Sequence, residues 1–94
     1  MDKNSIEKLS RYIEVSKNII SSEAYLEISH FYNHGEYEMA FEGLIIELIQ
    51  EAKYPQDFES SEWENLGMEF GFDKESVFDY DIWNKFIKWS SEKM

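Results

Sequence analysis

Carboxylates are abundant in this chain, whereas side chains that commonly bind transition metals are rare. The sequence has 20 Asp and Glu residues, two His residues and no Cys. His30 and His34 are four residues apart, so they would share one helix face, with Glu36 and Glu38 close behind. Two imidazoles and a carboxylate could bind a metal ion, but His near the carboxyl end of a helix is also favourable with its dipole. The spacing lacks the intervening Glu of a zinc-protease helix, and we predict no metal and no other cofactor.

The chain lacks the other patterns that catalysis commonly uses. It contains no glycine-rich phosphate loop, no Cys nucleophile and no Gly-x-Ser-x-Gly turn. General acid–base catalysis needs a carboxylate perturbed by burial or by a neighbour, and abundance alone does not identify one. We therefore predict that the protein is not an enzyme.

The negative charge is concentrated in the middle of the chain. Nine Lys and Arg residues against 20 Asp and Glu residues give a formal net charge of −11. Residues 21–52 contain seven acidic and no basic residues, and residues 53–81 contain nine acidic and two basic residues. Nucleic acid and anionic membranes are poor partners for such a chain, because both attract cations. We expect a basic protein as its partner.

Two groups of acidic residues could form the binding surface. Glu38 and Glu42 are four residues apart in an expected helix with no Lys or Arg to pair with, and like charges at this spacing destabilise a helix. A second group of four acidic residues, within residues 57–64, lies in an expected loop and at the start of the helix that follows it. Aromatic residues in the same segment could anchor an interface. A solvated helix face and an aromatic core would explain the same residues without a partner. The predicted partner-binding residues are Glu36, Tyr37, Glu38, Glu42, Asp57, Phe58, Glu59, Glu62, Trp63 and Glu64.

Helical periodicity predicts the elements that position these residues. Apolar residues recur at three- and four-residue intervals, and only four Gly and one Pro interrupt them. The segment over residues 36–52 is apolar around much of its circumference, so we expect it at the centre of the fold. An exposed apolar patch of Met39, Ile46 and Ile49 is the alternative. We predict an all-α fold, a compact bundle of about five helices that forms one domain over residues 1–94, with no significant sheet.

Polar and turn-forming residues mark the expected helix boundaries. Ser5 and Ser21 precede the first two apolar stripes, and Ser61 with Glu64 matches a capping box. Gly35 ends the second helix, which we expect over residues 23–32, and Tyr54-Pro55 ends the third. A further turn is expected over residues 73–78, and Asp79 or Asp81 would cap the last helix.

One segment resembles a known family. The string HGEYEMAFEGL, residues 34–44, opens the central helix. It resembles the small helical immunity proteins of bacterial toxin systems, in the MafI-like and CdiI-like group that accompanies contact-dependent growth inhibition toxins. The pattern Trp63-x-x-Leu66-Gly67, followed by a short helix and a Trp-rich C-terminus, is compatible with that group. The looser similarity in helix order and size extends over about two-thirds of the chain.

The resemblance implies an antitoxin that binds the toxin domain of its own system one-to-one and blocks its active site or substrate groove. Such toxins are often nucleases, commonly RNases, whose grooves are basic because they bind phosphate. Ala40 and Leu44 of the matched string face the core by their spacing. Glu36, Glu38 and Glu42 of the string are either structural or toxin-facing.

Two other interpretations remain open. A small acidic regulatory adaptor would bind a partner helix through an apolar groove. A metal-dependent enzyme would use His30 and His34. The lack of Cys and of any apolar run long enough for a signal peptide or a membrane span favours a cytoplasmic protein that contacts no membrane.

Overall fold

Five helices make up most of the fold in the computed structural model, which describes residues 2–93 and contains no strand among them. They are α1 (Lys3–Ser16), α2 (Ser22–Asn33), α3 (Tyr37–Glu51), α4 (Ser60–Glu69) and α5 (Ile82–Ser91). The predicted all-α bundle of about five helices is confirmed. Within residues 2–93, no helix combines the length and apolar character that crossing a bilayer requires.

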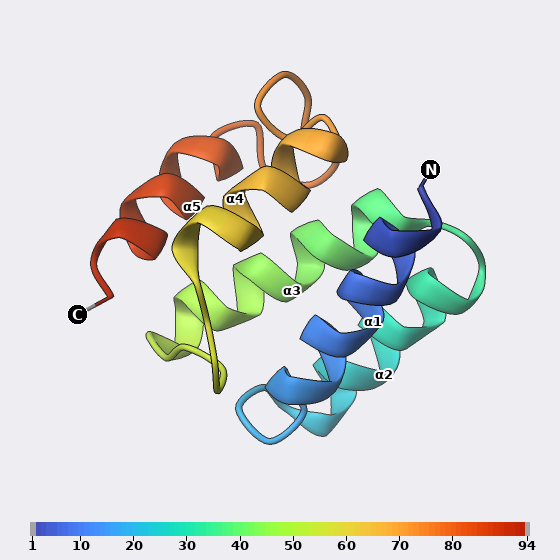
Figure 1. Ribbon diagram of the computed structural model, residues 1–94. Coiled ribbons are helices and arrows are strands. Elements are labelled where there is room, and N and C mark those ends of the chain that lie inside the picture. The colour runs from blue at the N-terminus through green and yellow to red at the C-terminus, as the bar shows by residue number, and fades with distance from the viewer. Residues whose placement is uncertain (1, 94) are drawn as a thin grey trace.

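The third helix, α3, lies at the centre of the bundle. Figure 1 shows α1 and α2 on one side of it and α4 and α5 on the other, and α3 contacts α1, α2 and α5. A helix that is apolar on several faces is most stable when it is surrounded by other elements, so the prediction of a central position is confirmed. Met39, Ile46 and Ile49 are half-buried and line three separate hollows instead of one exposed patch. The α3 residues with no exposed surface are Ala40, Phe41, Glu42, Leu44, Ile45 and Leu48.

Stacked aromatic rings join the two halves of the bundle. The Trp63 ring of α4 lies flat on the Tyr12 ring of α1, with centroids 4.0 Å apart and planes 4° apart. Its centroid also lies 6.2 Å from that of Phe41 and 5.1 Å from that of Phe58. Trp63 is only 1% exposed and Phe58 only 6%. The prediction that Phe58 and Trp63 anchor a partner is therefore wrong, because their apolar surface is already covered by the core.

The starts of the first two helices are fixed by side-chain caps. The Asp2 carboxylate accepts a hydrogen bond from the Asn4 N–H at 3.2 Å, so Asp2 caps α1. The predicted cap at Ser5 is wrong: Ser5 is buried one turn inside the helix, where its hydroxyl donates to Glu69 of α4. Ser21 caps α2 as predicted and accepts from the Ala24 N–H at 3.0 Å.

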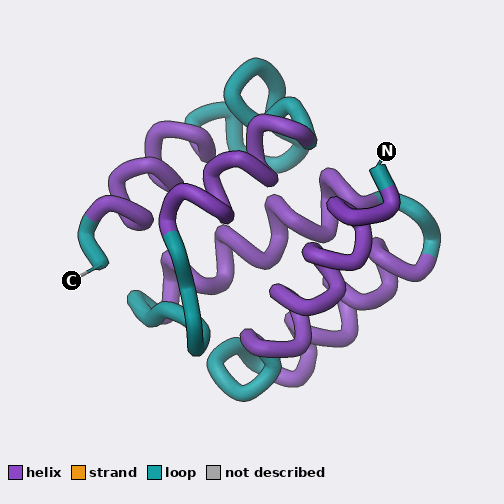
Figure 2. The backbone as a smooth tube through the Cα atoms, viewed as in Figure 1, coloured by secondary structure: helices purple, strands orange, loops and turns teal. Residues whose placement is uncertain are grey.

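The fourth helix begins differently from the prediction, and a glycine follows its end. The capping box of Ser61 and Glu64 does not form, because α4 already begins at Ser60 and Glu64 accepts a hydrogen bond from the Ser90 hydroxyl of α5. After α4, Gly71 adopts a φ of 81°, a left-handed conformation that favours glycine. The expected helical start over residues 73–78 is a series of turns and bends. A long irregular loop therefore connects α4 to α5, as the tube in Figure 2 shows.

Two helical glycines differ in how much room surrounds them, which gives a test of the packing. A Cβ atom added at Gly67 would lie 3.1 Å from Trp83 and 3.3 Å from Phe86, whereas at Gly43 the nearest atom, on Ile28, is 3.4 Å away. Alanine is favoured over glycine inside a helix by about 0.8–1.0 kcal/mol, so we expect Gly43→Ala to raise the free energy of unfolding. We expect Gly67→Ala to be about 1–3 kcal/mol less stable than Gly43→Ala, because it overpacks the core. Urea denaturation would measure both, and equal stabilities would contradict the close packing at Gly67.

Candidate partner-binding surface

The structure separates the predicted acidic residues into two groups at opposite ends of α3. Glu36 and Glu38, at the start of α3, are exposed and line a hollow of about 510 Å³. Asp57 and Glu59 are exposed in the connection that follows α3, where they line a different hollow of about 380 Å³ with Glu62. The two hollows share no lining residue, and α3, which is about 22 Å long at a rise of 1.5 Å per residue, lies between the two groups in the chain. The two groups therefore do not form one site.

Tyr37, which was predicted to lie with the first group, is half-buried. Its ring packs against Tyr32 of α2, with centroids 5.2 Å apart and planes 68° apart. An edge-to-face pair of this kind is favourable beyond the area it buries. Most of the Tyr37 side chain therefore holds the start of α3 against α2, and only part of it can meet a partner.

In the second group, Glu62 and Glu64 form contacts within the bundle. A guanidinium nitrogen of Arg11 lies 3.2 Å from Glu62 Oε1, and the Tyr12 hydroxyl donates to the same oxygen at 2.7 Å. Burial, together with this hydrogen bond, raises the pKa of the Tyr12 hydroxyl above its ordinary value. Glu64 accepts a hydrogen bond from Ser90, so it joins α4 to α5. Both carboxylates are partly buried, and only the remaining two acids of the group are fully available to a partner.

The Glu42 side chain is fully buried, although its carboxylate was predicted to face a partner. Its Oε1 accepts a hydrogen bond from the Val77 N–H at 2.6 Å, and its Oε2 accepts from the N–H groups of Phe78 and Asp79 at 2.6 and 2.8 Å. A buried carboxylate is costly unless it is fully hydrogen-bonded, and bonds to a charged acceptor are among the strong ones. The predicted surface role of Glu42 is therefore wrong. Its side chain instead fixes the α4–α5 loop to α3, and we call this attachment the tether.

His30 and His34 lie side by side near the carboxyl end of α2. Their ring centroids are 4.2 Å apart, and His34 Nδ1 lies 2.9 Å from the His30 carbonyl oxygen. Within residues 2–93, no three His, Asp or Glu side chains converge closely enough to hold a metal ion. Glu36, expected nearby, lines the hollow at the start of α3 with Glu38. The positions of the two imidazoles fit the alternative in which they interact with the dipole of α2.

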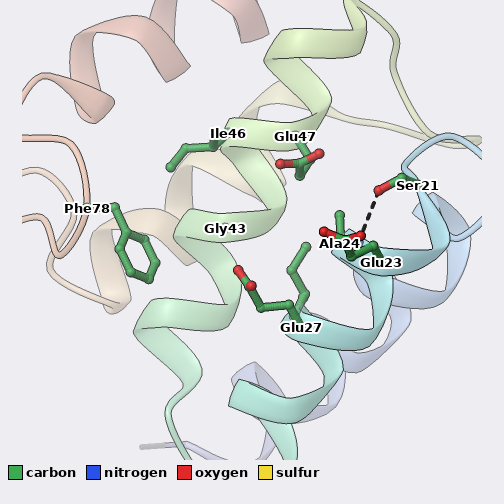
Figure 3. A pocket seen from close by; sticks show the side chains of 9 residues that line it. Ser21, Glu23, Ala24, Glu27, Gly43, Ile46, Glu47 and Phe78 are labelled. Carbon is green, nitrogen blue, oxygen red and sulfur yellow. Dashed lines mark hydrogen bonds between the residues drawn. The ribbon is translucent and has the colours of Figure 1, made fainter.

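A groove between α2 and α3 brings together acidic residues that were not among the predicted binding residues. Glu23 and Glu27 lie one turn apart on α2, and Glu47 lies across from them on α3 (Figure 3). The groove encloses about 270 Å³, and none of the described residues that line it is Lys or Arg. The remaining lining is mostly apolar or small: Ser21, Ala24, Ile28, Gly43, Ile46 and Phe78.

Part of this groove could have been predicted from the spacing of its acidic residues in the sequence. Residues 21–52 have no basic residue, and four-residue spacing places Glu23 and Glu27 on one face of α2. The spacing does not tell which neighbouring helix that face meets. The structure supplies this information, because Gly43 of α3 faces Ile28 of α2.

Phe78 connects the groove to the α4–α5 loop. Its ring centroid lies 5.9 Å from that of Phe31 on α2, and the side chain is half-exposed at one side of the groove. The hydrogen bond from its N–H to Glu42 fixes the backbone from which the ring projects. Tyr80, two residues later in the same loop, is 96% exposed. The groove and the loop therefore share Phe78, and Tyr80 follows in the same loop.

No protein-family model, curated protein or solved structure matches the chain. The resemblance to helical immunity proteins therefore depends chiefly on the string at residues 34–44. Within that string Ala40, Phe41, Glu42 and Leu44 are buried. These residues hold the fold together, so the exposed groove and loop are the better guide to a partner.

The tether formed by Glu42 can be tested with Glu42→Gln. A Gln side chain keeps one acceptor oxygen and replaces the other by an amide NH₂, which would face a backbone N–H. We expect the free energy of unfolding to fall by about 1–3 kcal/mol, because buried donors lose their acceptor. We also expect faster hydrogen exchange at the amides of Val77, Phe78 and Asp79. The exposed Glu38→Gln is the matched control, and unchanged exchange in Glu42→Gln would contradict the tether.

The pair of Asp79 and Lys85 predicts a pH-dependent contribution to stability. The hydrogen bond from Lys85 at 2.7 Å, followed by that from the Asp81 N–H, holds the pKa of Asp79 below its ordinary value of 3.8. A depressed pKa in the folded state contributes stability above the ordinary value, and this contribution is lost as pH falls below it. We expect Asp79→Asn to be less stable than wild type at pH 6 and the difference to shrink below about pH 3.8.

Urea denaturation of both proteins between pH 6 and pH 3 would measure this difference. The matched control is Asp73→Asn, which changes an exposed Asp of the same loop. Other carboxylates titrate over the same range in both proteins, so their contributions cancel in the comparison. A difference between wild type and Asp79→Asn that stays constant with pH would contradict the ion pair.

Proposed function

We propose that this protein is an immunity-type inhibitor, which binds a basic toxin domain of the nuclease class one-to-one and occludes its substrate groove. The observation that supports the proposal is the groove between α2 and α3. Its rim carries Glu23, Glu27 and Glu47, its floor is apolar, and no Lys or Arg is among the described residues that line it. A nuclease groove carries Lys and Arg to bind phosphate, so its charge is complementary to this rim.

The charge of the whole chain favours such an encounter. A formal net charge of −11 creates a field that attracts a basic protein and raises its rate of association. Once the partner is bound, the apolar floor can be covered by the stems of its Lys and Arg side chains, which are hydrocarbon chains. The inhibitor then occupies with carboxylates the positions where RNA would place phosphates.

The predicted acidic residues that are exposed outside the groove are proposed to assist binding. Glu36 and Glu38 share their hollow with Val77 of the tethered loop, so they are proposed as additional contacts beside that loop. Asp57 and Glu59 lie at the other end of α3 and are proposed to contribute long-range attraction. The proposed site of action is the cytoplasm, where RNA must be protected, and the mechanism requires no cofactor.

A co-expression experiment tests the proposal. The tagged protein is co-expressed with the product of the gene immediately upstream, and RNA cleavage is assayed with and without it. We expect capture of a one-to-one complex and loss of cleavage. If a correctly folded protein neither captures that product nor inhibits its cleavage, the proposed function is wrong.

A charge-reversal variant tests whether the groove makes the contact. Glu23, Glu27 and Glu47 are replaced together by Lys, and the control replaces three exposed acids elsewhere, Glu7, Glu51 and Glu92, by Lys. Both variants change the net charge equally, so long-range attraction falls by the same amount. We expect the groove variant to bind at least about 2 kcal/mol more weakly than the control, because only it loses direct contacts. Equal affinities of the two variants, measured by calorimetry, would exclude the groove as the binding site.

A further inference from the structure

The α4–α5 loop presents two aromatic side chains and a valine that are about half exposed or more. Tyr80 is 96% exposed, and Val77 and Phe78 are each 49% exposed. Single exposed apolar residues are normal on a protein surface, but several within a few residues mark an interaction site. The Phe78 ring also borders the α2–α3 groove, so this patch continues the surface already described.

Hydrogen bonds hold the backbone on both sides of Tyr80 in place. The N–H groups of Phe78 and Asp79 donate to the buried Glu42 carboxylate. The Asp81 N–H donates to Asp79 Oδ1 at 2.9 Å, so the turn around Tyr80 is closed on itself. A side chain presented from a fixed backbone loses less conformational entropy when it binds. The backbone that carries Tyr80 is therefore preorganised.

The residues on either side of Tyr80 in the chain, Asp79 and Asp81, carry carboxylates that are only partly neutralised. Lys85 bonds to Asp79 Oδ2 at 2.7 Å. Asp81 accepts a hydrogen bond from the Asn84 side chain through Oδ1 at 2.9 Å, and no described residue donates to its Oδ2. The charged groups of this segment, Asp79, Asp81 and Lys85, together carry one net negative charge. The segment thus contains an exposed aromatic ring and, at the next residue in the chain, a carboxylate oxygen to which no described residue donates.

We infer that this loop binds an arginine side chain of the partner, with the guanidinium stacked on the Tyr80 ring and hydrogen-bonded to Asp81. The inference rests on the proposed function, because it names the side chain through which the basic partner is recognised. A guanidinium is planar and weakly hydrated, so it stacks on aromatic rings while it donates to carboxylates in its own plane. A lysine ammonium is compact and strongly hydrated, so it gains less from the same site. Further basic residues of the partner continue past Phe78 into the α2–α3 groove.

Two peptides of equal charge test the inference without knowledge of the partner. Octa-arginine and octa-lysine, each with blocked ends, are titrated into the folded protein at fixed ionic strength by calorimetry. We expect wild type to bind octa-arginine about 2- to 5-fold more tightly than octa-lysine, the effect of one exposed cation–π contact. Tyr80→Leu should abolish this preference by weakening octa-arginine binding more than octa-lysine binding, whereas Tyr80→Phe should retain the preference.

Controls separate the inference from the proposed function. Met68→Ala, which removes a 47% exposed side chain from α4, should leave both affinities unchanged. Equal binding of both peptides by wild type, or a preference that survives Tyr80→Leu, overturns the arginine site and leaves the proposed function standing. Failure of both peptides to bind overturns the inference and also removes the charge complementarity on which the proposed function depends. Self-association that Tyr80→Leu abolishes would assign the patch to a second copy of the chain and overturn the inference.

Discussion

The buried carboxylate of Glu42 is the interaction on which the proposed binding surface depends. It lies in the central helix, and its hydrogen bonds to Val77, Phe78 and Asp79 attach a loop that is otherwise mostly exposed. A carboxylate without these donors would be costly in the core, and a loop without this acceptor would have few contacts to fix it. The position of Phe78 beside the α2–α3 groove and the turn around Tyr80 both follow from this tether.

Charge is distributed unevenly over the helices, and this unevenness affects the proposed binding surface. The Lys and Arg residues of the helices are in α1 and α5, whereas α2, α3 and α4 contain none. Arg11 of α1 and Lys85 of α5 each pair with an acid from another part of the chain, so the flanking helices are partly neutralised. The groove between α2 and α3 has no Lys or Arg among its described lining residues, so its negative charge is not neutralised locally. An approaching basic protein would be attracted to this groove as well as to the acidic loops.

The sequence was sufficient to predict the helices but not the roles of individual side chains. The apolar circumference of residues 36–52 predicted the central helix, and Ser21 marked the start of α2. Glu42 was misplaced because its spacing from Glu38 is the same whether the carboxylate is exposed or buried, and its donors lie about 35 residues away in the chain. Trp63 was misplaced because only the packing of α4 on α1 shows that its ring stacks on Tyr12. The groove depends on how α2 and α3 meet, which local periodicity does not encode.

The nature of the donors to Glu42 has a consequence for how the protein can diversify. All three are backbone N–H groups, and every residue except proline has one. Substitution of Val77, Phe78 or Tyr80 therefore changes the displayed side chain while the attachment of the loop persists. The recognition surface can follow a changing partner by point mutation, and the core need not change with it.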